Sequence, residues 1–254
     1  MVRLNSDETN VPSHIRDKLS QFCDKLQDVL GDTLVSVVLY GPTTKGQTSV
    51  ANGPPVNIML VLRDVTTGLL DRIAALVRKG ARDFRLSVMI LSKDDLQRST
   101  DVFPVKFLDM QQSHVVLCGE DVLEDLLIGG ENLRLRCEQE ARNTLVRLRN
   151  LYLHRANDPK QVQTTISSAV SSLLRTLNAF LFLVDGSWRH AEDDIVAAAT
   201  KLLRLDTDVL PRLLAVTEEQ HGLGASELKN LFDVLLSLAQ RIADVIDRFE
   251  QSDT

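Results

Sequence analysis

The 254-residue sequence has few cysteines and no excess of basic charge, and both shortages exclude classes of protein. Its three cysteines are an odd number without C-x-x-C spacing, so the sequence predicts neither a disulfide framework nor a zinc site. The formal net charge of −6 argues against a generic nucleic-acid binder, because such binding depends on clustered Lys and Arg that neutralise phosphates. We therefore expect no DNA partner.

Targeting signals, membrane signals and several catalytic motifs are also missing. The first eight residues lack the apolar run of a signal peptide. The most apolar segment, 166–184, is interrupted by Arg175 and Asn178, so it predicts a buried core helix rather than a membrane span. The cysteine usage fits a reducing compartment, and we expect a cytoplasmic protein with no membrane role. No G-x-G-x-x-G, P-loop or H-E-x-x-H motif occurs.

The first half of the chain alternates strand and helix patterns. Helical spacing of apolar residues predicts a helix capped by Ser13 that ends at Gly31, and a second helix over 67–78. Ser92, followed by two aspartates, predicts the start of a third helix. Short apolar or β-branched runs predict the strands of a covered mixed sheet, over 33–40, 56–62, 84–91, 103–110 and 114–117.

From residue 131 onward the apolar period is helical throughout. A long helix is expected to stop before Asp158–Pro159, because the residue before a proline disfavours the helical region. Further helices are predicted over 161–184, 192–203, 209–217 and 226–249. A bundle of four or five helices is the simplest way to bury their apolar stripes. The predicted fold class is α+β, with a mixed-sheet α/β domain at 1–129 and an all-α helical bundle domain at 130–254.

A glycine turn between two apolar strands is the most informative local pattern. The strand ending in Val-Val-Leu-Tyr is followed by Gly41-Pro-Thr-Thr-Lys-Gly46, and the next strand is Val-Asn-Ile-Met-Leu-Val-Leu. Glycine at the end of a buried strand lets the backbone approach a ligand closely. The pattern resembles the core of the nucleotidyltransferase fold, the polymerase-β-like superfamily. The runs F-P-V-K-F-L-D and V-L-C-G-E-D resemble uncharacterised bacterial nucleotidyltransferase-like proteins.

The resemblance implies a phosphate-holding Gly-Ser turn and an Asp-x-Asp pair that binds two divalent metals. This sequence has Asn57 and Met59 at the positions of the acids, and Pro42 at the position of the serine. Alternate residues of a strand point to one face, so Asn57 and Met59 should share a face. A neutral amide and a soft thioether suit Mg²⁺ poorly. We therefore expect no metal site and no catalytic residue at these degenerate positions.

Asn57 and several other residues remain as candidates for ligand binding. The turn could bind an anion through its backbone amides, the hydroxyls of Thr43 and Thr44, and the charge of Lys45. The candidate residues of the turn are Gly41, Pro42, Thr43, Thr44, Lys45 and Gly46. The family often carries a third acid on a later strand, which would fall within 103–109. If Lys106 faces the site, an ammonium stands at the metal position. If Asp109 faces it, one residual carboxylate remains.

The predicted long helix carries several arginines. Arg142 and Arg149 lie on one stripe, either as a solvated face with a Glu138–Arg142 ion pair or as ligands for a substrate carboxylate or phosphate in an interdomain cleft. Arg149 to His154 resembles the R-x4-6-H motif of the HEPN ribonucleases. Residues five apart on a continuous helix lie about 140° from each other, so the two side chains converge only if the helix ends or distorts there.

The leading hypothesis is a catalytically inactive nucleotidyltransferase-fold protein, a pseudoenzyme that binds a ligand or a partner. No cofactor is expected, ATP or another nucleotide is the candidate ligand, and a protein partner or a homo-oligomer is the other candidate. The first alternative is an active nucleotidyltransferase or adenylyltransferase that uses Mg²⁺ at a rebuilt metal site, with acids such as Asp64, Asp101 or Asp109. The second is a HEPN-like ribonuclease that uses Arg149 and His154.

Overall fold

The computed structural model describes residues 11–45, 55–218 and 223–249. The chain divides into two compact units, Met1–Ile128 and Gly129–Thr254, and each is described by itself. The predicted domains 1–129 and 130–254 imply that each unit folds independently. This stays a prediction.

The first unit is built on a mixed four-stranded sheet in the order β3-β2-β1-β4. Its strands are β1 Leu34–Tyr40, β2 Val56–Leu62, β3 Leu86–Ser92 and β4 His114–Gly119. β1 pairs antiparallel with both β2 and β4, whereas β2 pairs parallel with β3. Six of the seven residues of β2 are buried, because helices cover both faces of the sheet. The continuous apolar run of β2 therefore predicted its bounds correctly.

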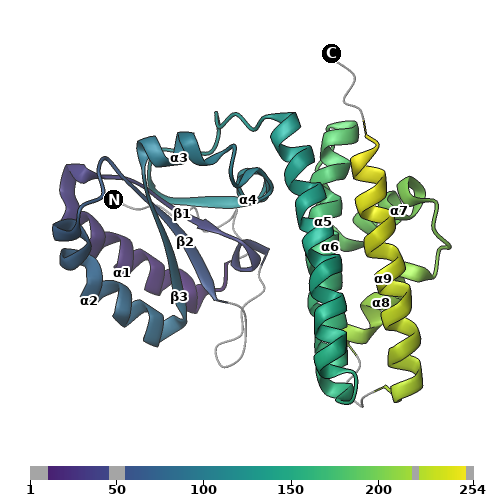
Figure 1. Cartoon of the computed structure of the whole chain (residues 1–254). Coiled ribbons are helices and arrows are strands. Elements are labelled where there is room, and N and C mark those ends of the chain that lie inside the picture. Colours follow the sequence, from purple (N-terminus) through teal and green to yellow (C-terminus); the bar gives the residue numbers. More distant parts are fainter. Residues whose placement is uncertain (1–10, 46–54, 219–222, 250–254) are drawn as a thin grey trace. The chain divides into compact units, whose positions relative to one another are not determined.

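Two pairs of helices cover the sheet, one pair on each face (Figure 1). Helices α1 Ser13–Leu30 and α2 Thr67–Phe84 pack on the face that carries Val37, Leu39 and Ile58. Helices α3 Lys93–Ser99 and α4 Pro104–Gln112 pack on the face that carries Val38 and Met59. Two short 3-10 helices, η1 Gly31–Thr33 and η2 Pro42–Lys45, flank β1.

Local sequence signals explain some of the helix ends in this unit. The predicted cap at Ser92 is confirmed, since its hydroxyl accepts from the Asp95 amide and the Asp95 carboxylate accepts from the Ser92 amide. The predicted cap at Ser13 is wrong, because Pro12 precedes the helix and Ser13 is its first residue. α2 runs beyond the predicted end at residue 78, and stops where Arg85 adopts a left-handed φ of 56°.

The prediction of a strand over 103–110 is wrong, because this segment forms helix α4. Pro104 occupies the first turn, where its missing N–H costs nothing. Phe107 and Met110 are buried three residues apart, as on one face of a helix, and fill the core over one sheet face. A short apolar run has the same composition in a buried strand and in a buried helix, so its pattern alone did not separate the two.

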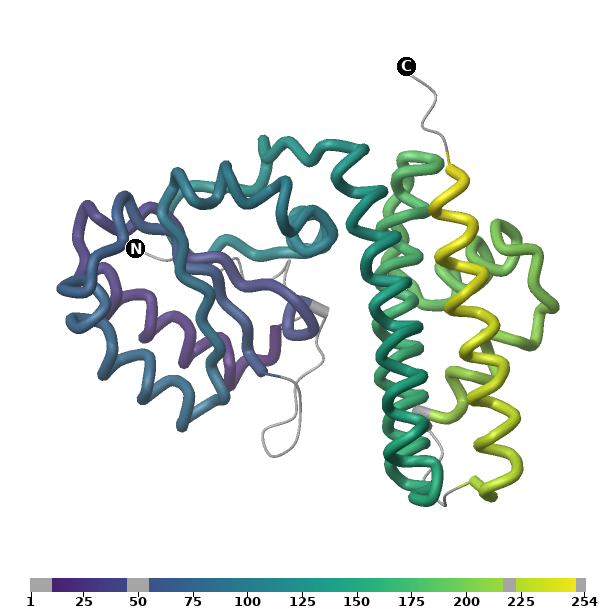
Figure 2. Tube along the Cα trace, viewed as in Figure 1, coloured from purple at the N-terminus to yellow at the C-terminus, as the bar shows by residue number. Residues whose placement is uncertain are grey.

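The second unit is all helical within the described residues. Its helices are α5 Gly130–Arg155, α6 Pro159–Asp185, α7 Glu192–Leu203, α8 Val209–Glu218 and α9 Ala225–Asp247. α6 packs against each of the other four, and α5, α6 and α9 run alongside one another (Figure 2). Ring contacts between Tyr152 and Phe232, and between Phe180 and Phe249, join α5 and α6 to the region of α9.

Helix α6 is the one described helix long and apolar enough to cross a membrane by length and composition. Of its most apolar 18-residue window, 61% is buried inside the protein. A core helix of a soluble protein has the same character, and α6 supplies the centre of the bundle. The α+β fold class, with a mixed sheet followed by a helical bundle, is confirmed.

Candidate functional site

The glycine turn follows β1 directly and folds back on itself. Gly41 has a φ of 80°, which an L side chain rarely adopts, and η2 begins at the next residue. The Thr44 amide and hydroxyl both donate to the Gly41 carbonyl oxygen, at 3.0 and 2.8 Å. These two donors of Thr44, which the sequence offered to an anion, are therefore used inside the turn.

Thr43 is the buried polar residue of the turn. Its side chain is 0% exposed, and its hydroxyl has no hydrogen-bond partner among the described residues. The Thr44 hydroxyl lies 2.9 Å from that of Ser113, which comes just before β4. The turn is thus fixed to the edge strand of the sheet. The side chain of Lys45 and all of Gly46 lie outside the described residues.

A row of four polar side chains crosses the sheet beside this turn. Strand register places His114 opposite Tyr40, Tyr40 opposite Asn57, and Asn57 opposite Ser87. A Cβ on Gly41 would lie 3.1 Å from the Asn57 side-chain nitrogen, so the turn and Asn57 are in close approach. Because paired residues point to one face, the row lies on the face covered by α3 and α4.

Met59 lies one row deeper on the same face as Asn57. Its side chain is 0% exposed and belongs to a core cluster that includes Val38, Leu96 and Phe107. On the sheet it lies between Val38 of β1 and Met89 of β3. Met59 therefore fills the core, where the resemblance implies the second metal-holding acid.

Lys106 reaches the same end of the sheet from helix α4. Its ammonium nitrogen lies 5.8 Å from the centre of the Tyr40 ring, a cation–π distance. Burial raises the pKa of the Tyr40 phenol. Lys106 is exposed to solvent, and Tyr40 of β1 pairs with Asn57 of β2. The ammonium group is therefore open to solvent and close to the strand that borders Asn57.

The expected third-acid strand does not exist, because Lys106 and Asp109 lie on α4. Asp109 is half-buried. The sheet residue beside Asn57 is instead Ser87 of β3, an exposed hydroxyl. Pairing between distant segments determined this neighbour, and the sequence offered no local signal for it.

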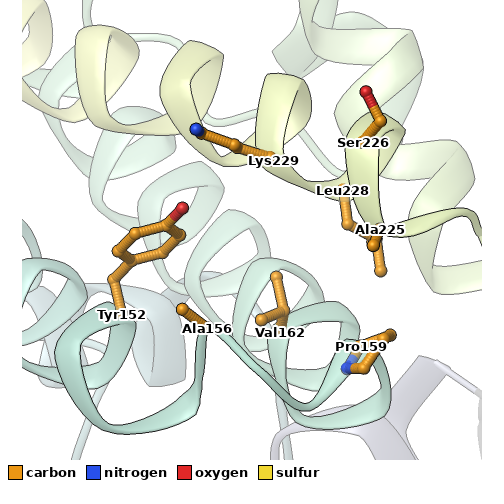
Figure 3. A pocket seen from close by; sticks show the side chains of 8 residues that line it. All are labelled: Tyr152, Ala156, Pro159, Val162, Ala225, Ser226, Leu228 and Lys229. Atoms are coloured by element: carbon orange, nitrogen blue, oxygen red, sulfur yellow. The ribbon is translucent and has the colours of Figure 1, made fainter.

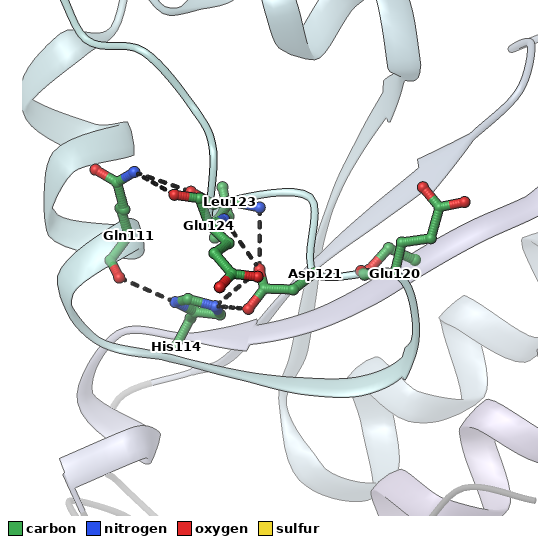
Figure 4. Close-up of polar contacts among 7 residues, drawn as sticks. Gln111, His114, Glu120, Asp121, Leu123 and Glu124 are labelled. Carbon is green, nitrogen blue, oxygen red and sulfur yellow. Dashed lines mark hydrogen bonds and ion pairs between the residues drawn. The ribbon is translucent and has the colours of Figure 1, made fainter.

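A second polar cluster surrounds His114 at the start of β4 (Figure 4). The His114 Nδ1 donates to the Gln111 carbonyl oxygen at 3.1 Å, and Nε2 lies 3.0 Å from the Asp121 carboxylate. The amides of Leu123 and Glu124 also donate to Asp121, at 3.1 and 3.2 Å. Partial burial opposes ionisation of Asp121, but these hydrogen bonds outweigh it and hold the pKa of the carboxyl below its usual value.

The cluster around His114 positions the edge strand rather than offering a free base. Both ring nitrogens of His114 are engaged, and only 14% of its side chain is exposed. The Gln111 amide group donates to the carbonyl oxygens of Leu123 and Leu126. These hydrogen bonds hold the segment after β4 against the end of α4. Sequence reasoning missed this cluster, because its members come from a helix, a strand and a turn.

The acids considered for a rebuilt metal site lie away from the polar row. Asp64 follows the end of β2 opposite to Asn57, and Asp101 follows α3. Within the described residues, no three His, Cys, Asp or Glu side chains form a group that could hold a metal ion.

The arginine candidates belong to the second unit. Arg142 forms the predicted ion pair with Glu138 at 2.7 Å and a second with Asp247 of α9 at 3.4 Å. Arg149 is exposed on α5. Since α5 is continuous through Arg155, Arg149 and His154 are about 140° apart around its axis. The convergence that a HEPN-like nuclease needs is therefore absent from α5.

A cavity of about 350 Å³ opens in the second unit between the α5–α6 turn and the start of α9 (Figure 3). Tyr152, Pro159, Val162 and Leu228 give it a mainly apolar lining, and Lys229 supplies a charge. The Tyr152 ring rests against Phe232, with 4.8 Å between the ring centres. None of the predicted site residues lines this cavity.

The mixed sheet with its glycine turn, followed by a helical bundle, is a nucleotidyltransferase-like fold. Among solved structures, the chain is similar to the spectinomycin adenyltransferase AAD(9) from Enterococcus faecialis, whose crystal structure contains ATP and spectinomycin. The TM-score is 0.52, the sequence identity is 10%, and the match covers 89% of this chain and 98% of the other. No family model and no curated protein sequence matches the chain. The likeness at this identity shows the fold alone.

Proposed function

We propose that the protein binds a nucleotide, or another phosphate-bearing small molecule, at the glycine turn without transferring a nucleotidyl group. The observation that carries the proposal is the pair Asn57 and Met59 on β2, the first beside Gly41 and the second buried in the core. The protein is then a pseudoenzyme on a nucleotidyltransferase-like fold.

The chemistry of two-metal catalysis explains why this pair argues against transfer. Two divalent cations about 4 Å apart need anionic oxygen ligands to offset their mutual repulsion. Asn57 offers a neutral carbonyl oxygen, and Met59 offers a soft thioether within an apolar cluster. Pro42 supplies neither a hydroxyl nor an amide hydrogen where the family has serine. Metal binding and the usual phosphate grip are both weakened.

Three features remain that favour an anionic ligand. Gly41 allows the backbone to come close, the Thr43 hydroxyl is buried with no partner among the described residues, and Lys106 brings an ammonium to the same end of the sheet. We infer that Lys106 provides the positive charge that metals provide in active relatives. Contacts from Lys45 and Gly46 stay predictions, as do a cytoplasmic location, a protein partner and a homo-oligomer.

A calorimetric titration with ATP in the presence of EDTA tests the proposal. ATP is the chosen probe because the crystal structure of the similar adenyltransferase contains it. We expect binding that Lys106→Met weakens by about tenfold, since one charge-assisted hydrogen bond contributes roughly 1.5 kcal/mol. Lys79→Met is the matched control, because Lys79 is also exposed but lies on α2, which covers the opposite face of the sheet.

Other results would count against the proposal. Equal weakening by both lysine variants indicates a nonspecific charge effect, and no binding of ATP, ADP or inorganic phosphate removes the ligand class. The active alternative predicts Mg²⁺-dependent labelling of an acceptor by radioactive ATP. The ribonuclease alternative predicts metal-independent RNA cleavage that His154→Ala abolishes.

A further inference from the structure

Two cysteines from distant parts of the sequence meet in the core of the first unit. Cys23 is on α1 and Cys118 is on β4, and α1 packs against β4. Cys23 is 0% exposed, and half-buried Cys118 packs against the same core cluster. Both are free thiols, and their side chains lie close enough that a hydrogen-bonding interaction between them is the main influence on the pKa of each. The two thiols are therefore neighbours that are not joined by a disulfide.

The two thiols are chemically unequal. The hydrogen bond from Cys23 lowers the pKa of Cys118 and outweighs the opposing effect of partial burial. The same hydrogen bond, together with burial, raises the pKa of Cys23. Cys118 is thus the better nucleophile and the more accessible thiol, whereas Cys23 stays protonated beside it.

We propose that Cys23 and Cys118 are a site of reversible oxidation, at which hydrogen peroxide converts the thiol pair to a disulfide. In the first step the Cys118 thiolate attacks one peroxide oxygen, an S–O bond forms, the O–O bond breaks, and the leaving hydroxide takes a proton to become water. In the second step the Cys23 sulfur attacks the Cys118 sulfenic acid. An S–S bond forms, the S–O bond breaks, and the Cys23 proton leaves with hydroxide as water. The two thiols supply the two electrons that reduce the peroxide.

The disulfide would join the first helix to the edge strand. It would close a long loop and so restrict the unfolded chain, which favours the folded state. The oxidised protein should therefore unfold at a higher temperature than the reduced protein.

Cys137 is the internal control for this chemistry. It is buried on α5 in the second unit, where its thiol lies 3.7 Å from the Thr176 carbonyl oxygen. Burial raises its pKa to about 12. A buried thiol with so high a pKa should resist oxidation under the conditions that convert the pair.

Peptide mapping of the full chain tests the proposal without any variant. The protein is treated with hydrogen peroxide under native conditions, free thiols are blocked, and the digest is analysed without reductant by mass spectrometry. The expected result is a linked peptide pair containing Cys23 and Cys118, lighter by two hydrogen atoms than its reduced parts, that dithiothreitol separates.

One variant separates the roles of the two paired cysteines, and a second variant serves as the control. In Cys23→Ser the Cys118 sulfenic acid should persist and react with dimedone, and Cys137→Ser should leave the linked peptide unchanged. Recovery of Cys118 as a free thiol, or as sulfinic acid alone in the unaltered protein, would overturn the proposal. Faster oxidation of Cys137 than of Cys118 would also overturn it.

Discussion

Replacing Met59 with alanine tests whether this side chain is core rather than the wall of an open metal site. Met59 is 0% exposed, with strand neighbours on both sides and the α3–α4 layer above it. The substitution removes three heavy atoms from a position enclosed on every side, where little collapse can occur.

Core substitutions of methionine by alanine cost about 2–5 kcal/mol, and the enclosure of Met59 favours the middle of this range, about 3 kcal/mol. Met59→Leu keeps the volume nearly constant, so it should cost less than about 1.5 kcal/mol. The difference between the two variants isolates the effect of the cavity from that of the thioether.

Hydrogen exchange measured by mass spectrometry is the suitable assay. The chain has one tryptophan, Trp188, and it lies in the second unit, so tryptophan fluorescence does not report on β2. A loss of about 3 kcal/mol should speed exchange in peptides from β1 and β2 by roughly a hundredfold, where exchange requires unfolding of the unit. An increase of less than about fivefold in Met59→Ala would refute the burial of Met59.

Two further substitutions, at Gly119 and Asp121, test the packing and hydrogen bonding at the end of β4. Gly119 has a φ of 87°, and a Cβ there would collide with the Val35 carbonyl oxygen. Gly119→Ala should therefore lower the free energy of unfolding by at least about 2 kcal/mol. In the control Gly68→Ala the added Cβ meets nothing within 4 Å, so the free energy of unfolding should change by less than about 1 kcal/mol. Equal effects in urea denaturation would contradict this reasoning. The lowered pKa of Asp121 means that its carboxylate stabilises the fold above the ordinary carboxyl pKa of about 3.9, and that this contribution is lost as pH falls through the lower folded-state value. Asp121→Asn should therefore be less stable than the unaltered protein near pH 6, and thermal unfolding should show this difference shrinking below about pH 4; a constant difference would exclude the linkage.

Local patterns predicted the strands and helices that bury one continuous apolar surface. β2 was located to the residue, because a run covered on both faces needs no polar alternation. α7 was also located to the residue, with three acids in its first turn. The spacing of Asn57 and Met59 placed both on one face, since a strand alternates with a period of two.

The composition of the site depended on contacts that no local pattern encodes. Ser87 became the neighbour of Asn57 only through the parallel pairing of β2 with β3. The helix at 104–112 was mistaken for a strand, and this error moved the expected third acid onto the wrong kind of element. Lys106 was named as a candidate, but its contact with the Tyr40 ring required the packing of α4 over the sheet.

The affinity for ATP with and without Mg²⁺ tests the central claim most directly. If Asn57 and Met59 have replaced the metal-holding acids, calorimetry should give similar affinities in EDTA and in excess Mg²⁺, and no pyrophosphate should be released in either condition. Binding that appears only with Mg²⁺ and is followed by pyrophosphate release would contradict the claim.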